Sequence, residues 1–100
     1  MQSAVKHLIE KYKLSCSAEA RYMDLTSEVG ELGKELLKSS AYGSRPLQTT
    51  RAITEEAGDC LFSLLALMNE LQINAEEALQ SVLGKYEQRF YAKGSIDSGR

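Results

Sequence analysis

Apolar residues recur at helical spacing in four segments of this chain and alternate as in a β-strand in none. Each segment gathers its apolar residues on one face, so each is predicted to form an amphipathic helix. The four sets are Met1, Val5, Leu8, Ile9 and Tyr12; Tyr22, Leu25, Val29, Leu32 and Leu36; Ile53, Ala57, Cys60, Leu64, Leu67 and Leu71; and Ala75, Leu79, Val82, Tyr86 and Phe90. The fold is therefore predicted to be all-α.

The residues between these segments are typical of helix ends. Ser17 can cap the second helix, and Asn74 followed by Glu77 has the spacing of a capping box before the fourth. Residues 41–46 are predicted to break the chain between the second and third helices, with Gly43 and Pro46 as the stops. Four helices with short connections indicate a four-helix up-and-down bundle.

The length of 100 residues fits one domain, predicted over residues 1–94. Gly94 is predicted to end the last helix and to leave residues 95–100 as a flexible polar tail. The third helix carries apolar residues away from its main stripe, namely Leu61, Phe62, Leu65 and Met68. A helix that is apolar nearly all round has to be covered on both sides. We expect a homodimer or homotetramer, against the alternative of one bundle that encloses this helix.

The charge balance excludes some classes of partner. A formal net charge of −2 argues against a surface for nucleic acid polymers, which needs a basic excess. No run reaches the about 18 consecutive apolar residues of a membrane span, and the first residues lack the apolar run of a signal peptide. Cys16 and Cys60 are expected to be free thiols, as in a reducing compartment. These features predict a soluble, cytoplasmic protein.

An internal repeat points to the chemistry of the chain. Residues 26–37 align with residues 54–65, and threonine, glutamate, glycine and two leucines coincide. Both segments contain two acids three residues apart: Glu28 with Glu31 in the first, and Glu56 with Asp59 in the second. Each pair has the same position relative to its own apolar stripe. Antiparallel packing through the stripes would therefore bring the two pairs face to face.

Four converging carboxylates require a cation or protons. Two like charges about 5 Å apart repel by about 3 kcal/mol at an effective dielectric of about 20. Oxygen ligands of this kind favour Mg²⁺, with Mn²⁺ as a substitute. A single pair of acids at this spacing is usually a solvated helix face. Two matched pairs indicate a metal site formed by Glu28, Glu31, Glu56 and Asp59.

The motifs resemble those of a known family. Glu28-Val-Gly-Glu31-Leu and Glu55-Glu-Ala-Gly-Asp59 look like the two metal motifs of the MazG-like all-α nucleotide pyrophosphohydrolases, which have dimeric dUTPase relatives. Lys85-Tyr-Glu-Gln-Arg89-Phe is similar to part of their last helix. The resemblance covers roughly residues 20 to 91. It implies that the four acids hold Mg²⁺ and act in catalysis, and that a nucleoside triphosphate, a deoxynucleoside triphosphate above all, is cleaved to monophosphate and pyrophosphate.

A bound metal ion would neutralise only part of the negative charge of a triphosphate, so basic side chains are needed to balance the rest. Lys85 and Arg89 are four residues apart on one flank of the fourth helix, and with the family resemblance we expect them to contact phosphate. The alternative is a solvated basic edge. Lys34 is a weaker candidate for the same role. Glu35 is expected either to position water or to pair with Lys34 or Lys38.

Two other functions fit parts of the pattern. Phosphoribosyl-ATP pyrophosphatases share the architecture, but that family usually has a histidine soon after its second acidic motif, where this chain reads Cys60-Leu-Phe-Ser63. A non-catalytic acidic helical module that binds other proteins is the alternative from a different class. Such a module would show no stabilisation by Mg²⁺ or Mn²⁺.

Overall fold

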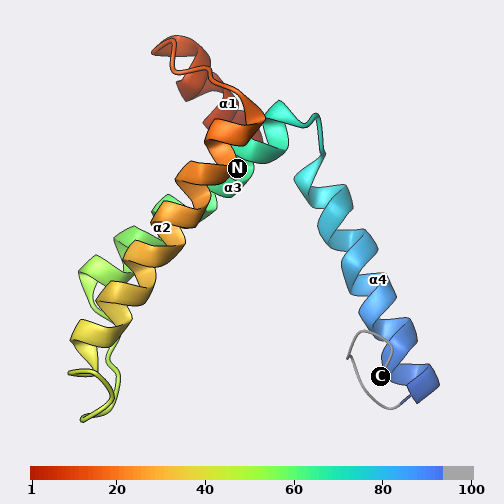
Figure 1. The fold of residues 1–100 in the computed structure, drawn as a ribbon. Coiled ribbons are helices and arrows are strands. Elements are labelled where there is room, and N and C mark those ends of the chain that lie inside the picture. The colour runs from red at the N-terminus through yellow and green to blue at the C-terminus, as the bar shows by residue number, and fades with distance from the viewer. Residues whose placement is uncertain (94–100) are drawn as a thin grey trace.

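The computed structural model describes residues 1–93, and these form four helices with no strand among them. The helices are α1 (Gln2–Lys11), α2 (Ala18–Ser39), α3 (Arg51–Glu70) and α4 (Ala75–Lys93) (Figure 1). The all-α prediction is confirmed. The predicted stop at Gly94 and the predicted tail over residues 95–100 lie outside the described residues.

Side-chain oxygens cap three of the helices. The hydroxyl of Ser17 accepts a hydrogen bond from the backbone N–H three residues later at 3.1 Å, and Thr50 does the same for α3 at 3.1 Å. The Oδ1 atom of Asn74 accepts from the N–H of Glu77 at 2.9 Å. Each cap satisfies a backbone donor that the first turn of a helix leaves unpaired. The predicted caps at Ser17 and Asn74 are confirmed.

The end of α2 comes before the residues predicted to stop it. The helix ends at Ser39, and Ala41 and Tyr42 then adopt left-handed backbone conformations with φ of 47° and 59°. The N–H of Tyr42 donates to the carbonyl of Leu37 at 2.7 Å, which closes the last turn. Gly43, with φ of 89°, therefore lies inside a turn that has already left the helix.

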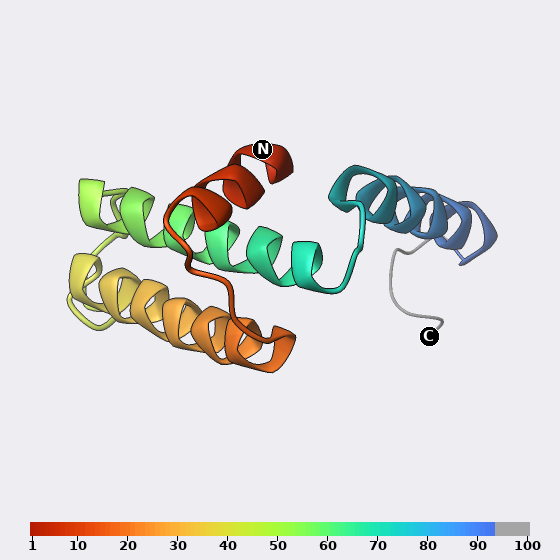
Figure 2. The ribbon, with the colours of Figure 1, turned by 90° about the horizontal axis from the view of Figure 1, so that it is seen from above.

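Helices α2 and α3 lie side by side and run antiparallel, while α1 crosses α3 (Figure 2). The small core sits at that crossing and consists of Val5, Ile9, Leu65 and Ala66. Ala66 is fully buried, at 0% exposure. Its methyl group lets α1 approach the backbone of α3 closely, because a larger side chain would separate the two helices.

Helix α4 does not complete the predicted bundle within one chain. It leaves the end of α3 at residues 71–74 and projects away from α2 and α3 (Figure 1). Helix α1 packs against α3 at Leu65 and Ala66, whereas α4 packs along neither α2 nor α3. The radius of gyration is 16.8 Å; a compact 100-residue domain has about 13 Å. The expectation of a closed bundle is thus corrected to an open arrangement.

Gln2 fixes the start of α4 against α1. Its side-chain oxygen accepts a hydrogen bond from the N–H of Ala75 at 2.8 Å, and its side-chain nitrogen donates to the carbonyl of Ile73 at 2.6 Å. The side chain of Asn69 donates to the backbone carbonyl of Gln2 at 3.3 Å. Three bonds on one residue therefore join the first helix to the end of α3, to the connection after it and to the first residue of α4.

The apolar residues of α3 that lie away from its main stripe, namely Leu61, Phe62, Leu65 and Met68, are covered only in part. Leu65 is buried against α1, and Phe62 and Met68 are half-buried beside the same core. Leu61 remains 42% exposed. One flank of α3 thus gains its cover from α1, and the homo-oligomer expected from this face stays a prediction.

Cys16 and Cys60 are free thiols, as predicted. None of the helices in residues 1–93 combines the length and the apolarity needed to cross a membrane.

The core at the α1–α3 crossing predicts a difference between two neighbouring residues. Ile9→Ala should lower the free energy of unfolding by about 2–4 kcal/mol, because it leaves a cavity at a side chain that is only 5% exposed. Leu8→Ala, at a residue 42% exposed, should cost less than about 1 kcal/mol. Urea denaturation of both variants measures the difference. Equal losses would contradict the assignment of this core.

Candidate metal centre

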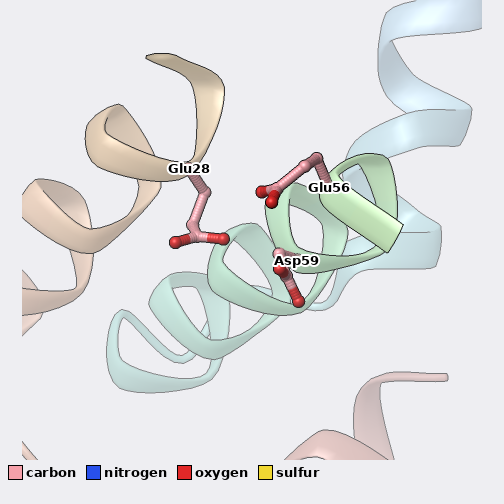
Figure 3. A group of neighbouring side chains, drawn as sticks. All are labelled: Glu28, Glu56 and Asp59. Carbon is pink, nitrogen blue, oxygen red and sulfur yellow. The ribbon is translucent and has the colours of Figure 1, made fainter. Parts of the chain in front are cut away.

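Three carboxylates from two helices meet on one side of the α2–α3 pair. Glu28 comes from α2, and Glu56 and Asp59 come from α3; one oxygen of each lies within 4.8 Å of the others (Figure 3). Glu28 and Glu56 are half-buried, whereas Asp59 is exposed. We call these three residues the acidic triad.

The helix geometry explains this convergence. Two residues three positions apart lie on the same side of an α-helix, so Glu56 and Asp59 project together from α3. The half-buried leucines of α2, Leu25 and Leu32, flank Glu28 along the helix and bring it against α3. Apolar packing between the two helices therefore holds the triad together, although the carboxylates repel one another.

Glu31 is not a member of the triad. It lies one turn after Glu28 on α2 and is exposed. Its negative charge is nevertheless among the causes that raise the pKa of Glu28 and of Glu56. The structure thus brings three of the four predicted acids within 4.8 Å and leaves the fourth nearby.

The electrostatic environment of the triad favours protons or a cation. Burial is the largest cause that raises the pKa of Glu28, followed by the charge of Asp59. The same two causes, in the same order, raise the pKa of Glu56. Among the described residues, no ion pair involves a member of the triad; the pairs are Arg21 with Asp24, Lys38 with Glu35, and Arg51 with Glu55. An all-oxygen donor set without a basic partner fits a hard divalent cation.

The predicted phosphate ligands of α4 lie apart from the triad. The Nζ atom of Lys85 lies 5.5 Å from the centroid of the Tyr86 ring, and the Cζ atom of Arg89 lies 5.9 Å from it. Since α4 projects away from α2 and α3, one chain does not bring these two side chains to its own carboxylates (Figure 1). Lys34 is exposed on α2, one turn after Gly30.

Two neighbours of the triad have roles that the sequence pattern left open or missed. Glu35 pairs with Lys38 at 3.4 Å, which was one of the two expectations for it. Cys60 was predicted only to be a free thiol in the apolar stripe of the third helix. Burial is the largest cause that raises its pKa, and the charges of Glu28, Glu56 and Asp59 raise it further. Its position four residues after Glu56 on the same helix is the signal that would have placed it beside the acids.

Comparison with known proteins assigns the family. The MazG nucleotide pyrophosphohydrolase domain matches residues 17–91 of this chain. The chain belongs to the MazG family. The matched range includes α2, α3, most of α4 and all four predicted acids. Membership of this family indicates that the MazG chain has nucleotide pyrophosphohydrolase activity.

A relative of this MazG chain is the uncharacterized protein YpjD of Bacillus subtilis (strain 168). It is 37% identical over 93 residues, which cover 89% of this chain and 82% of that protein. No solved structure matches the chain.

The raised pKa values predict how stability without metal depends on pH. Because Glu28 and Glu56 bind protons more tightly in the folded state, folded protein holds more protons than unfolded protein. Their contribution to stability should therefore be present below the ordinary value of 4.5 and be lost as pH rises through the raised values. In the presence of a chelator, the melting temperature should fall less with rising pH for Glu56→Gln than for wild type.

A matched control is Glu70→Gln, at an exposed glutamate at the end of the same helix. This variant should follow the wild-type pH dependence. If the melting temperatures of wild type and Glu56→Gln change with pH in the same way, repulsion among the triad carboxylates does not reduce stability.

Proposed function

We propose that this chain is a Mg²⁺-dependent pyrophosphohydrolase of nucleoside triphosphates, deoxynucleoside triphosphates above all, with a nucleoside monophosphate and pyrophosphate as products. The observation that supports it most is the acidic triad on two antiparallel helices of a MazG family member. Carboxylate oxygens are the ligands that Mg²⁺ prefers, and Mn²⁺ accepts the same set.

The metal would be held by Glu28, Glu56 and Asp59, with Glu31 as the fourth proposed ligand. Glu31 would reach the site by a change of its side-chain rotamer, since it is exposed and one turn away from Glu28. When bound, a divalent cation neutralises charge on phosphate oxygens and lowers the pKa of a coordinated water.

The reaction we propose is the attack of water on the α-phosphorus. A bond forms between the water oxygen and this phosphorus, and the bond from the phosphorus to the bridging oxygen of the β-phosphate breaks. Pyrophosphate leaves with the electron pair of that bond. One carboxylate among the acidic triad and Glu31 would accept the proton that the water loses.

The remaining charge of the substrate requires basic groups. A triphosphate carries about four negative charges, more than one divalent cation neutralises. Lys85 and Arg89 are the proposed phosphate ligands, with Lys34 as a weaker candidate on the acid-bearing helix itself. An arginine and a lysine four residues apart on a helix present their donors along the same side.

Substitutions of the triad test its catalytic role. Glu56→Gln and Asp59→Asn should each reduce the release of pyrophosphate by at least about a hundredfold, because each removes a charged metal ligand. The helical content should stay unchanged. Glu55→Gln is the neighbouring control, since Glu55 pairs with Arg51 at 2.9 Å rather than with the triad, and it should retain most of the activity. Wild-type turnover in Glu56→Gln or Asp59→Asn would overturn the proposed site.

The site of attack can be read from the products. Hydrolysis in ¹⁸O-labelled water should place the label in the nucleoside monophosphate and leave pyrophosphate unlabelled. A panel of ribo- and deoxyribonucleoside triphosphates, with phosphoribosyl-ATP beside them, then ranks the substrates by kcat/KM. Label in free orthophosphate, with a diphosphate as the other product, would mean attack at the γ-phosphorus and would refute the mechanism.

A further inference from the structure

Helix α4 is held to the rest of the described chain at its base. The N–H of Ile73 donates to the carbonyl of Met68 at 2.9 Å, and Gln72 takes a left-handed conformation with φ of 57°, so the chain turns out of α3 there. Within residues 1–93, α4 then packs along neither α2 nor α3, and a groove of about 740 Å³ opens between α3 and α4 (Figure 1). The direction of α4 therefore depends on the bonds made at its first residues.

The side-chain amide of Gln2 binds the backbone on both sides of the residue that caps α4. Its oxygen accepts a hydrogen bond from the N–H of Ala75 at 2.8 Å, and its nitrogen donates to the carbonyl of Ile73 at 2.6 Å. Between these two residues stands Asn74, whose own side chain accepts from the N–H of Glu77. Asn74 thus caps the helix, whereas Gln2 ties the capped end to α1.

This pair of bonds requires a side chain that donates and accepts at the same time. The amide of glutamine provides both, on two separate atoms. A glutamate in its place would keep an acceptor for Ala75 but would bring a negative oxygen to the carbonyl of Ile73. A methionine has a similar length and offers neither a donor of this kind nor a strong acceptor. The two bonds therefore depend on the chemistry of Gln2 and not only on its size.

The backbone of Gln2 is itself anchored to α3. The side chain of Asn69 donates to the carbonyl of Gln2 at 3.3 Å. Gln2 is the first residue of α1, and one turn later Val5 enters the core that contains Leu65 and Ala66 of α3. A series of contacts thus leads from the buried core through the first turn of α1 to the base of α4.

We propose that Gln2 is a positioning residue of the pyrophosphohydrolase reaction: it sets the direction in which α4 leaves α3 and thereby places Lys85 and Arg89 for contact with phosphate. This role rests on the proposed function. Both basic residues belong to the same helix as Ala75, ten and fourteen residues further on, so their positions follow from the direction of its axis. Gln2 acts through the backbone at the base of α4 and not by contact with the substrate.

Spin labels test the direction of α4 without any turnover. In a chain with Cys16→Ser and Cys60→Ser, labels at Ala52→Cys on α3 and Gln88→Cys on α4 report the distance between two exposed positions. Refolding with an excess of unlabelled chain restricts the signal to pairs within one molecule. Gln2→Met should shift or broaden the distribution of this distance, because it removes both bonds at the base of α4.

Two further variants control this measurement. Ser3→Ala, at the neighbouring exposed residue of α1, should leave the distance distribution unchanged. Gln2→Glu keeps the length of the side chain and loses the donor to Ile73, so it should also alter the distribution. Circular dichroism should show the same helical content in all three variants. A wild-type distribution in both Gln2→Met and Gln2→Glu would overturn the proposal.

Kinetics test whether Gln2 acts through the basic residues of α4. Gln2→Met should lower kcat/KM for a nucleoside triphosphate at least about fivefold, because contacts to phosphate are misplaced. In a chain that already carries Lys85→Ala and Arg89→Ala, the same substitution should change kcat/KM less than about twofold, because those contacts are gone. A residue that only stabilises the fold would lower kcat/KM by the same factor in both backgrounds, and this outcome would overturn the proposed role.

Two readouts separate this role from the chemistry of the site. The rise in melting temperature on addition of Mg²⁺ or Mn²⁺, measured without nucleotide, should be the same for Gln2→Met and wild type, since the acidic triad lies on α2 and α3. If wild type releases no pyrophosphate while Gln2→Met still alters the spin-label distance, the proposed function fails, but the control of α4 by Gln2 is supported. Pyrophosphate release that Gln2→Met leaves at the wild-type rate would instead refute the role of Gln2 alone.

Discussion

The apolar contact between α2 and α3 is the interaction on which the site depends. It holds three carboxylates within 4.8 Å of one another, an arrangement that their mutual repulsion opposes. Burial of apolar side chains where α2 and α3 pack against each other supplies the opposing free energy. Because the acids stand at the edge of that contact, they are partly desolvated, which is the first cause of their raised pKa values. A cation would relieve both the repulsion and the desolvation.

The elements of the fold could be predicted because their causes are local. Helical periodicity marks all four helices, and the side chains of Ser17 and Asn74 act within three residues of their own positions. The end of α2 was harder to predict. Ala41 takes the left-handed conformation that glycine usually provides, so the turn forms before Gly43 is reached. Residue type alone does not reveal such an exception.

The position of α4 was not predictable, since apolar periodicity shows that a face needs cover but not which element covers it. The stripes of α2 and α4 contain Val29 and Leu79, which the described chain leaves more than half exposed, at 53% each. The repeat likewise put Glu28, Glu31, Glu56 and Asp59 in matched places. It did not distinguish Asp59, which joins the triad, from Glu31, which is likewise exposed and holds the same place in its own pair but lies outside the triad. The ligand roles of these four residues stay predictions.

The three hydrogen bonds of Gln2 make the direction of α4 depend on a helix that contributes no residue to the candidate site. Both polar atoms of that side chain form hydrogen bonds there, one with Ile73 in the connection between α3 and α4 and one with Ala75, the first residue of α4. A residue near one end of the chain thus orients a helix that begins more than seventy positions later. Because these bonds hold α4 only at its base, a small change in the angle between α1 and α3 would displace the far end of α4 more than its first turn.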